Sequence, residues 1–136
     1  MPNLIEEGSS LTLNFGKIHS IAQTGESVIP VVVQHADTKE VLIIAYINKK
    51  ALAYARTHKI ATFWSTSRNK LWIKGETSGD YLDIITMAVN CEQNAMLWQV
   101  RPRQHGACHT KTKTNQTRAT CFYRTLENDT LINREP

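Results

Sequence analysis

The stretch VIPVVVQHADTKEVLIIAYIN, residues 28–48, carries the clearest folding signal in the chain. Its two apolar runs, residues 28–34 and 41–46, are rich in β-branched side chains, which favour extended strands. The six residues between them, HADTKE, have the composition of a turn. The stretch therefore predicts a β-hairpin with both strands buried.

A helix is predicted directly after this hairpin. Asn48 can cap it, because an asparagine side chain accepts hydrogen bonds from the first free N–H groups of a helix. Over residues 48–59, Ala51, Leu52 and Ala55 provide one apolar face and basic side chains provide the other.

Two further hairpins follow, and they set the fold class. One pairs residues 61–65 with 70–75, and the other pairs residues 81–89 with 95–100. Loops are expected at residues 75–79 and 90–94, a short strand at residues 121–123 and a short helix near residues 11–17. This order predicts one α+β domain over residues 1–136, with a mostly antiparallel or mixed sheet and one main helix.

Composition excludes several classes of protein. With 41% hydrophobic and 21% charged residues, the chain has the make-up of a globular protein, and no apolar run approaches the roughly 18 residues of a membrane span. The first residues lack the basic start and apolar core of a secretory signal, so we expect a cytoplasmic protein. The net charge is +4, but the basic residues are scattered and the tract at residues 111–118 has no aromatic side chain, so nucleic acid is not an expected partner.

The three cysteines, Cys91, Cys108 and Cys121, are candidates for chemistry. Cytoplasmic thiols stay reduced, so a disulfide is the least favoured role. No CxxC pair is present, which excludes a closed four-cysteine zinc site within one chain. Three thiolates would leave a fourth position on zinc open for water, as hydrolysis requires. Equally, cysteine is among the residue types most often buried, and spacing alone does not decide between these interpretations.

Other polar residues have two interpretations each. His109 could relay protons beside a metal held by Cys108, or it could be an ordinary loop histidine. The run at residues 64–79 combines hydroxyl groups, charges and two tryptophans, which suits a phosphorylated ligand or a solvated hairpin equally well. The turn at residues 90–94 offers oxygen ligands to a hard cation, and turn chemistry explains it as well.

Several segments, in order, resemble the phosphoribosyl-AMP cyclohydrolase family of histidine biosynthesis. They are IPVVVQ (29–34), EVLIIAYIN (40–48), WSTSR (64–68), LWIKGETSG (71–79), GACHT (106–110) and CFYR (121–124). The resemblance runs from about residue 13 to residue 124 and implies an intertwined homodimer. It also implies a zinc hydrolase that opens the adenine ring of phosphoribosyl-AMP between N1 and C6, by attack of a zinc-bound hydroxide on C6.

The resemblance also implies roles for individual residues. Carried over by motif, the zinc ligands are Cys91, Cys108 and Cys121, in a site shared between subunits. His109 is the expected acid and base, and Glu76 and Lys74 line the pocket as further catalytic candidates. The expected substrate contacts are Ser65, Ser67, Arg68, Trp72, Ser78, Thr110 and Arg124.

This chain departs from the family at two places. Asn90, Glu92 and Asn94 stand where the family has three magnesium-binding aspartates. Neutral amides bind Mg²⁺ poorly, so the predicted magnesium site is weak or absent. Residues 109–120 form a longer tract between two cysteines than the family has. These departures keep two alternatives open: a diverged paralogue that hydrolyses or deaminates another phosphoribosylated or related heterocycle, and a non-catalytic relative that binds zinc or a nucleotide.

Overall fold

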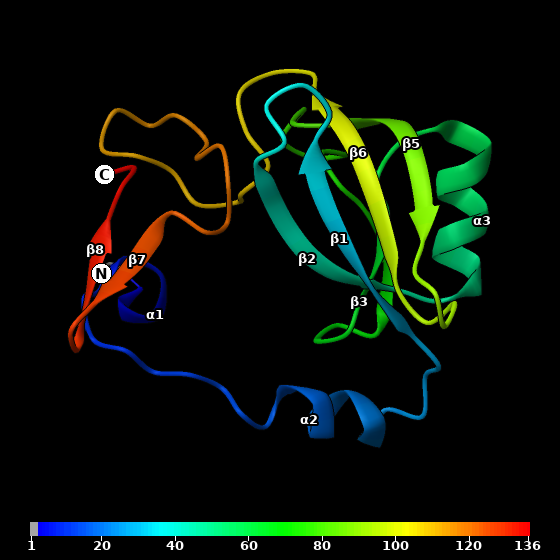
Figure 1. Cartoon of the computed structure of the whole chain (residues 1–136), viewed down its shortest axis with the longest axis horizontal. Helices are drawn as coiled ribbons and strands as arrows, with labels where there is room; N and C mark the ends of the chain where they lie inside the picture. Colours follow the sequence, from blue (N-terminus) through cyan, green and yellow to red (C-terminus); the bar gives the residue numbers. More distant parts are fainter. Residues whose placement is uncertain (1–2) are drawn as a thin grey trace.

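The structure, a computed structural model, describes residues 3–136. Figure 1 shows a central sheet with a helix beside it, and a smaller part where the two ends of the chain meet. The elements, in chain order, are α1 (Leu4–Glu7), α2 (Lys17–Gln23), β1 (Ile29–His35), β2 (Val41–Ile47), α3 (Lys49–His58), β3 (Thr62–Ser65), β4 (Lys70–Ile73), β5 (Leu82–Val89), β6 (Met96–Pro102), β7 (Arg124–Glu127) and β8 (Thr130–Asn133).

The main sheet has four strands in the order β2-β1-β6-β5, and it is mixed. β1 pairs antiparallel with β2 and parallel with β6, and β5 pairs antiparallel with β6. A separate two-stranded sheet joins β3 to β4. All three predicted hairpins and the α+β class are thereby confirmed. The prediction that both strands of the first hairpin are buried holds for one face, because Val41 and Ile44 at the sheet edge are exposed.

Helix α3 begins where the sequence predicts. The Asn48 side chain accepts a hydrogen bond from the backbone N–H of Ala51 at 2.9 Å, which satisfies one of the free donors of the first turn. Ala51 and Ala55 are fully buried, so this face packs against the sheet side of the molecule. The helix ends at Lys59, whose backbone is left-handed with φ of 58°.

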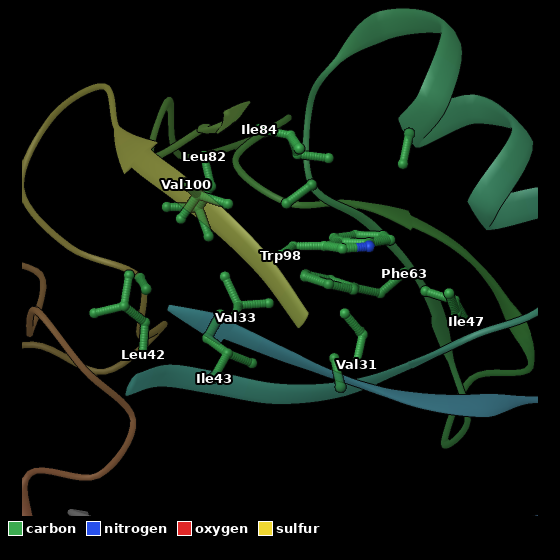
Figure 2. Close-up of a cluster of buried hydrophobic side chains, with 14 of the residues drawn as sticks. Val31, Val33, Leu42, Ile43, Ile47, Phe63, Leu82, Ile84, Trp98 and Val100 are labelled. Atoms are coloured by element: carbon green, nitrogen blue, oxygen red, sulfur yellow. The ribbon is translucent and has the colours of Figure 1, made fainter. Parts of the chain in front are cut away.

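The core lies between the inner face of the main sheet, the β3–β4 hairpin and α3 (Figure 2). Phe63 and Trp98 stack with ring centroids 5.8 Å apart, and both are fully buried. Val31 and Val33 of β1 point into the same cluster. Burying a large apolar side chain contributes about 1.5–3 kcal/mol, so this cluster fixes the frame on which the loops are held.

Two local predictions are wrong. The short helix expected near residues 11–17 begins instead at Lys17, because Asn14 accepts a hydrogen bond from the N–H of Gly16 and forms a turn before it. Residues 121–123 are not a strand; the strand that follows them, β7, starts at Arg124 and pairs with β8. Cys121 instead docks on the edge strand β2, where its N–H donates to the carbonyl of Leu42.

The N-terminal and C-terminal segments meet. Figure 1 shows α1 beside the β7–β8 hairpin, and Ser10 forms a bridge with Thr130. Within residues 3–136, no helix has the length and apolar character needed to cross a membrane.

Candidate functional site

Residues 106–110 and 118–121 run side by side and bring two cysteines together. The N–H of Cys108 donates to the carbonyl of Arg118 at 3.1 Å, and a second bond of the same kind lies next to it. Gly106 permits this approach, because a Cβ at this position would lie 2.1 Å from the carbonyl oxygen of Arg118. A glycine at position 106 is thus required for these two segments to pack closely.

The longer tract between the cysteines folds as a turn outside this pair. Lys111 bridges with Thr117, and the N–H of Thr112 donates to the carbonyl of Gln116 at 2.8 Å. The turn has its own internal hydrogen bonds and lies beyond those that join residues 107–108 to residues 118–119. The extra residues therefore leave the two cysteines close to each other.

The thiols of Cys108 and Cys121 interact and shift each other's pKa in opposite directions. A hydrogen bond with Cys121 lowers the pKa of Cys108 to about 5, and hydrogen bonds from the hydroxyl and N–H of Thr110 contribute to the same shift. The pKa of Cys121 is raised, first by its hydrogen bond with Cys108 and then by desolvation. Two sulfur atoms therefore stand together, and sulfur donors suit a soft or borderline metal ion.

Lys74 lies beside this pair at the end of β4. Its side chain is 4% exposed, and its ammonium donates to the backbone carbonyl of Asp80 at 2.9 Å. Burial lowers the pKa of Lys74, while Asp80, Cys121 and Cys108 act in the opposite direction. One carboxylate oxygen of Asp80 accepts from the hydroxyl of Thr117 at 2.9 Å, and the other is buried and finds no partner within residues 3–136.

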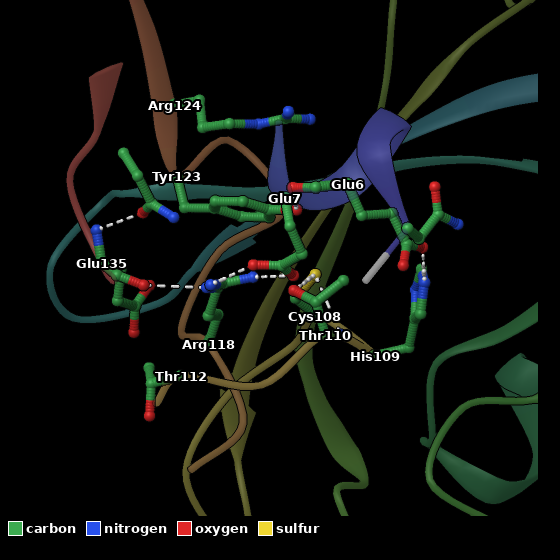
Figure 3. A network of polar contacts seen from close by, with 12 residues as sticks. Glu6, Glu7, Cys108, His109, Thr110, Thr112, Arg118, Tyr123, Arg124 and Glu135 are labelled. Carbon is green, nitrogen blue, oxygen red and sulfur yellow. Dashed lines mark hydrogen bonds and ion pairs between the residues drawn. The ribbon is translucent and has the colours of Figure 1, made fainter. Parts of the chain in front are cut away.

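Two consecutive glutamates of α1 reach the same region (Figure 3). The carboxylate of Glu6 lies 2.5 Å from Nε2 of His109. Glu7 forms a bidentate ion pair with Arg118, with N–O distances of 2.7 and 2.8 Å. The charges of α1 are therefore matched to basic groups on the segment that holds Cys108.

Arg124 also contacts α1. Its guanidinium donates to the carbonyls of Ile5 and Gly8, and the hydroxyl of Tyr123 donates to the carbonyl of Glu6. Because these donors already have partners on α1, the predicted substrate contact of Arg124 would require it to exchange them. That role stays a prediction.

Cys91 lies apart from the other two cysteines. It is exposed in the turn between β5 and β6, while Cys108 follows the far end of β6 (Figure 1). A strand of seven residues, such as β6, is roughly 20 Å long. Accordingly, residues 3–136 contain no cluster of three or more His, Cys, Asp or Glu side chains able to hold one metal ion.

The neighbours of Cys91 hold the turn together. The amide of Asn90 donates to the amide oxygen of Asn94 at 2.6 Å, and its own oxygen accepts from the N–H groups of Asn94 and Ala95. The amides at the predicted magnesium positions are thus used as turn-forming groups, and Glu92 is exposed.

The remaining predicted residues divide between the two ends of the β3–β4 hairpin. Ser65, Ser67 and Arg68 lie at its turn, where the N–H of Arg68 donates to the hydroxyl of Ser65 at 3.3 Å. Trp72 packs against Phe63 in the core. At the other end, Glu76 and Ser78 follow Lys74 in the exposed loop, and Ser78 accepts from the N–H of Asp80.

Local patterns missed several residues of this region: Glu6, Glu7, Asp80, Thr117 and Arg118. Asp80 follows the KGETSG loop directly, which is the one available signal for it. Arg118 belongs to a basic tract whose members look alike in the sequence, and only the fold separates its 2% exposed side chain from the exposed lysines nearby.

The comparisons with known proteins agree on one family. Residues 43–123 match the family model described as phosphoribosyl-AMP cyclohydrolase. Proteins named phosphoribosyl-AMP cyclohydrolase are similar over most of this chain. The one from Caulobacter vibrioides (strain NA1000 / CB15N) is 44% identical over 81% of this chain and 76% of its own length. The one from Methanothermobacter thermautotrophicus is 40% identical over 93% and 83%, and the one from Methylococcus capsulatus is 35% identical over 88% of each.

Proposed function

The chain belongs to the phosphoribosyl-AMP cyclohydrolase family, a family of cyclic-amidine hydrolases, and on this premise we propose that it opens the adenine ring of phosphoribosyl-AMP in histidine biosynthesis. The bond broken is N1–C6, and water supplies the oxygen that C6 gains. The reaction needs an activated water, a group that moves protons and a polar site for the phosphates.

One observation carries the proposal: the three cysteines are divided between the two ends of strand β6. Cys108 and Cys121 stand together, and Cys91 is exposed beyond the other end of β6. In a two-fold symmetric homodimer, Cys91 of the partner subunit would complete the ligand set for Zn²⁺. The donors fit this ion, because thiolates are its usual ligands and Cys108 is already acidic.

Three thiolate ligands would leave one coordination position for water. When bound, zinc would supply a Lewis acid that activates water at neutral pH. His109 follows a ligand directly and is exposed, so its imidazole can accept or donate a proton at the reacting purine. The buried ammonium of Lys74 offers positive charge beside the sulfurs, where it can stabilise a developing anion.

The candidate phosphate contacts and Lys74 are also separated along the β3–β4 hairpin. Ser65, Ser67 and Arg68 lie at the turn of the β3–β4 hairpin, whereas Lys74 follows the other end of β4. A site shared between subunits would join this turn of one copy to the sulfur pair of the other. In this arrangement, hydroxyl groups and a guanidinium would hold one end of a purine nucleotide, and the catalytic groups would face its other end.

Exposed apolar side chains support a second copy of the chain as the partner. Ile44 and Val32 pair across the outer face of the sheet, and Ile44 is 52% exposed. The arm before β1 carries Phe15, which is 91% exposed, and Ile18. Uncovered apolar groups on an extended arm are typical of chains that wrap around a partner.

A complementation experiment tests the shared site. Cys91→Ser and Cys108→Ser subunits with different tags are coexpressed, and the mixed dimer is isolated by both tags. Each homodimer should lack zinc and activity, whereas the mixed dimer has one intact site and should recover about half of the wild-type activity. A mixed dimer as inactive as its parents would refute the shared site, and a monomer in sedimentation would refute the dimer.

The reaction itself is tested by the ultraviolet change on adding phosphoribosyl-AMP to the purified protein, together with the zinc content. Turnover supports the proposal. Bound zinc without turnover would favour the paralogue acting on another heterocycle, and a protein with neither would favour the non-catalytic relative.

A further inference from the structure

Glu6 and His109 are in direct contact although they are far apart in the sequence. The carboxylate Oε2 of Glu6 lies 2.5 Å from Nε2 of His109 (Figure 3). Glu6 precedes the residues that match the family model, so this contact joins an N-terminal segment of this chain to a residue inside the matched region.

The position of Glu6 is well fixed. Next to it, Glu7 pairs with the buried guanidinium of Arg118. On the other side of the helix, the backbone carbonyl of Glu6 accepts the hydroxyl of Tyr123 at 2.7 Å, and Arg124 donates to the carbonyls of the neighbouring residues Ile5 and Gly8. These donors all come from the segment that carries Cys121, so α1 and the sulfur pair are held in one frame.

His109 has little else to orient it. Its side chain is 71% exposed, so packing does not restrict the ring. A carboxylate can only accept, and a hydrogen bond from Nε2–H to Glu6 therefore selects the tautomer with its proton on Nε2. Nδ1 is then left with a free lone pair, ready to take a proton.

We propose that Glu6 is a positioning residue for His109: it fixes the tautomer and the orientation of the imidazole for proton transfer during ring opening. This rests on the proposed function, in which His109 moves protons at the purine. Glu6 itself need not touch the substrate, since it acts through the ring of His109. Outer groups that orient a metal-ligating imidazole typically contribute about 10–100-fold to metal affinity or activity, and we expect an effect of this order for His109.

The test compares Glu6→Ala and Glu6→Gln with wild type, with Leu4→Ala as the control. Leu4 lies on the same short helix and is 76% exposed, and its apolar side chain cannot accept a hydrogen bond from His109. We expect kcat to fall about 10-fold or more in Glu6→Ala and less in Glu6→Gln, whose amide oxygen can still accept from Nε2–H, with KM, zinc content and Tm nearly unchanged. In a His109→Ala background, Glu6→Ala should cause no further loss of residual activity, because the two residues act as one unit.

A second readout does not depend on turnover. In ¹⁵N NMR spectra of the labelled protein, His109 should show one tautomer with the proton on Nε2, and Glu6→Ala should give a mixture. Unchanged tautomer populations in Glu6→Ala would overturn the proposal. A kcat of Glu6→Ala equal to or above that of wild type would also overturn it. An increase would mean that α1 covers the site in wild type. If wild type turns over no phosphoribosyl-AMP, the proposed function fails, and the NMR measurement still decides whether Glu6 orients His109.

Discussion

The guanidinium of Arg118 makes a bidentate ion pair with the carboxylate of Glu7, across a separation of 111 positions in the chain. The side chain of Arg118 is 2% exposed, and it also lies over the ring of Tyr123 at 4.3 Å. A buried guanidinium without a counter-ion is costly, so this pair ties α1 to the segment that holds the sulfur pair.

Glu7→Gln is therefore expected to lower the free energy of unfolding by about 1–3 kcal/mol, because a charged group loses its partner while it remains buried. Urea unfolding measures this change. The matched control is Glu127→Gln, which breaks the ion pair with Arg134 at a site where both side chains are more than half exposed. That pair should contribute less than about 0.5 kcal/mol. Equal losses in the two variants would contradict the difference in burial.

The same pair predicts a dependence on pH. The hydrogen bond from Arg118 holds the pKa of Glu7 below its ordinary value of 4.5. A carboxyl group whose pKa is lower in the folded state stabilises that state while it is ionised, and this contribution is lost as the pH falls through the folded pKa. The stability difference between wild type and Glu7→Gln should be constant from about pH 6 to 8 and shrink below pH 4.5. Urea titrations at several pH values measure it; a difference that grows toward acid would contradict the assignment.

The hairpins and α3 could be predicted because their signals are local. Alternating or β-branched runs, a capping Asn48 and polar turns act within a few residues of one another. The parallel pairing of β1 with β6 could not be read in this way, since it joins distant segments. The β7–β8 hairpin was missed although Asn128 and Asp129 mark its turn, because its strands carry few buried side chains.

The residues of the candidate site show the same difference between local signals and contacts of distant segments. The cysteines and His109 are candidates by residue type, and only the resemblance to a family gives them predicted roles. The groups that hold them, Glu7, Arg118 and Asp80, act through contacts between distant segments and have no local pattern. Such contacts are visible only after the core has brought the segments together.

Gly106→Ala should destabilise the pairing of residues 106–110 with 118–121. A Cβ there would lie 2.1 Å from a backbone carbonyl oxygen, which cannot move aside as a flexible side chain could. We expect a loss of about 1–3 kcal/mol, by thermal unfolding, and a reduced zinc content. Gly16→Ala is the control, because its φ of −88° suits alanine and its nearest atom lies at 3.4 Å. Full zinc binding in Gly106→Ala would argue against the role of this pairing.

Shortening the turn between the cysteines should leave the proposed zinc site intact. Replacing residues 112–116 by Asn-Gly should preserve the hydrogen bonds from Cys108 to Arg118 and from Arg118 to Thr110, and remove only the outer part of the turn. Loop length has a weak effect on stability, so the change should be within about 1 kcal/mol. Zinc analysis and thermal unfolding check these points, and a changed KM would assign the tract to substrate selection. Loss of zinc would show that the turn supports the sulfur pair.

Magnesium should have little effect on this protein, because the groups that replace the family aspartates are occupied. The amides of Asn90 and Asn94 bond to each other at 2.6 Å and close the turn that carries Cys91. We expect activity and Tm to be unchanged by a chelator specific for magnesium. Two carboxylates at this distance would repel each other, so Asn90→Asp with Asn94→Asp should lower Tm by a few degrees in the absence of a cation.

Added Mg²⁺ should restore the stability of that double variant, since carboxylate oxygens are the ligands that this ion prefers. The single variant Glu92→Gln is the control, because it removes the one carboxylate of the turn. Magnesium should change neither the Tm of wild type nor the Tm of Glu92→Gln. A wild-type protein whose Tm or activity depends strongly on magnesium would show that Glu92 and the two amides still bind the ion. In that case the amide pair would have to open on binding, and the turn with Cys91 would change shape with it.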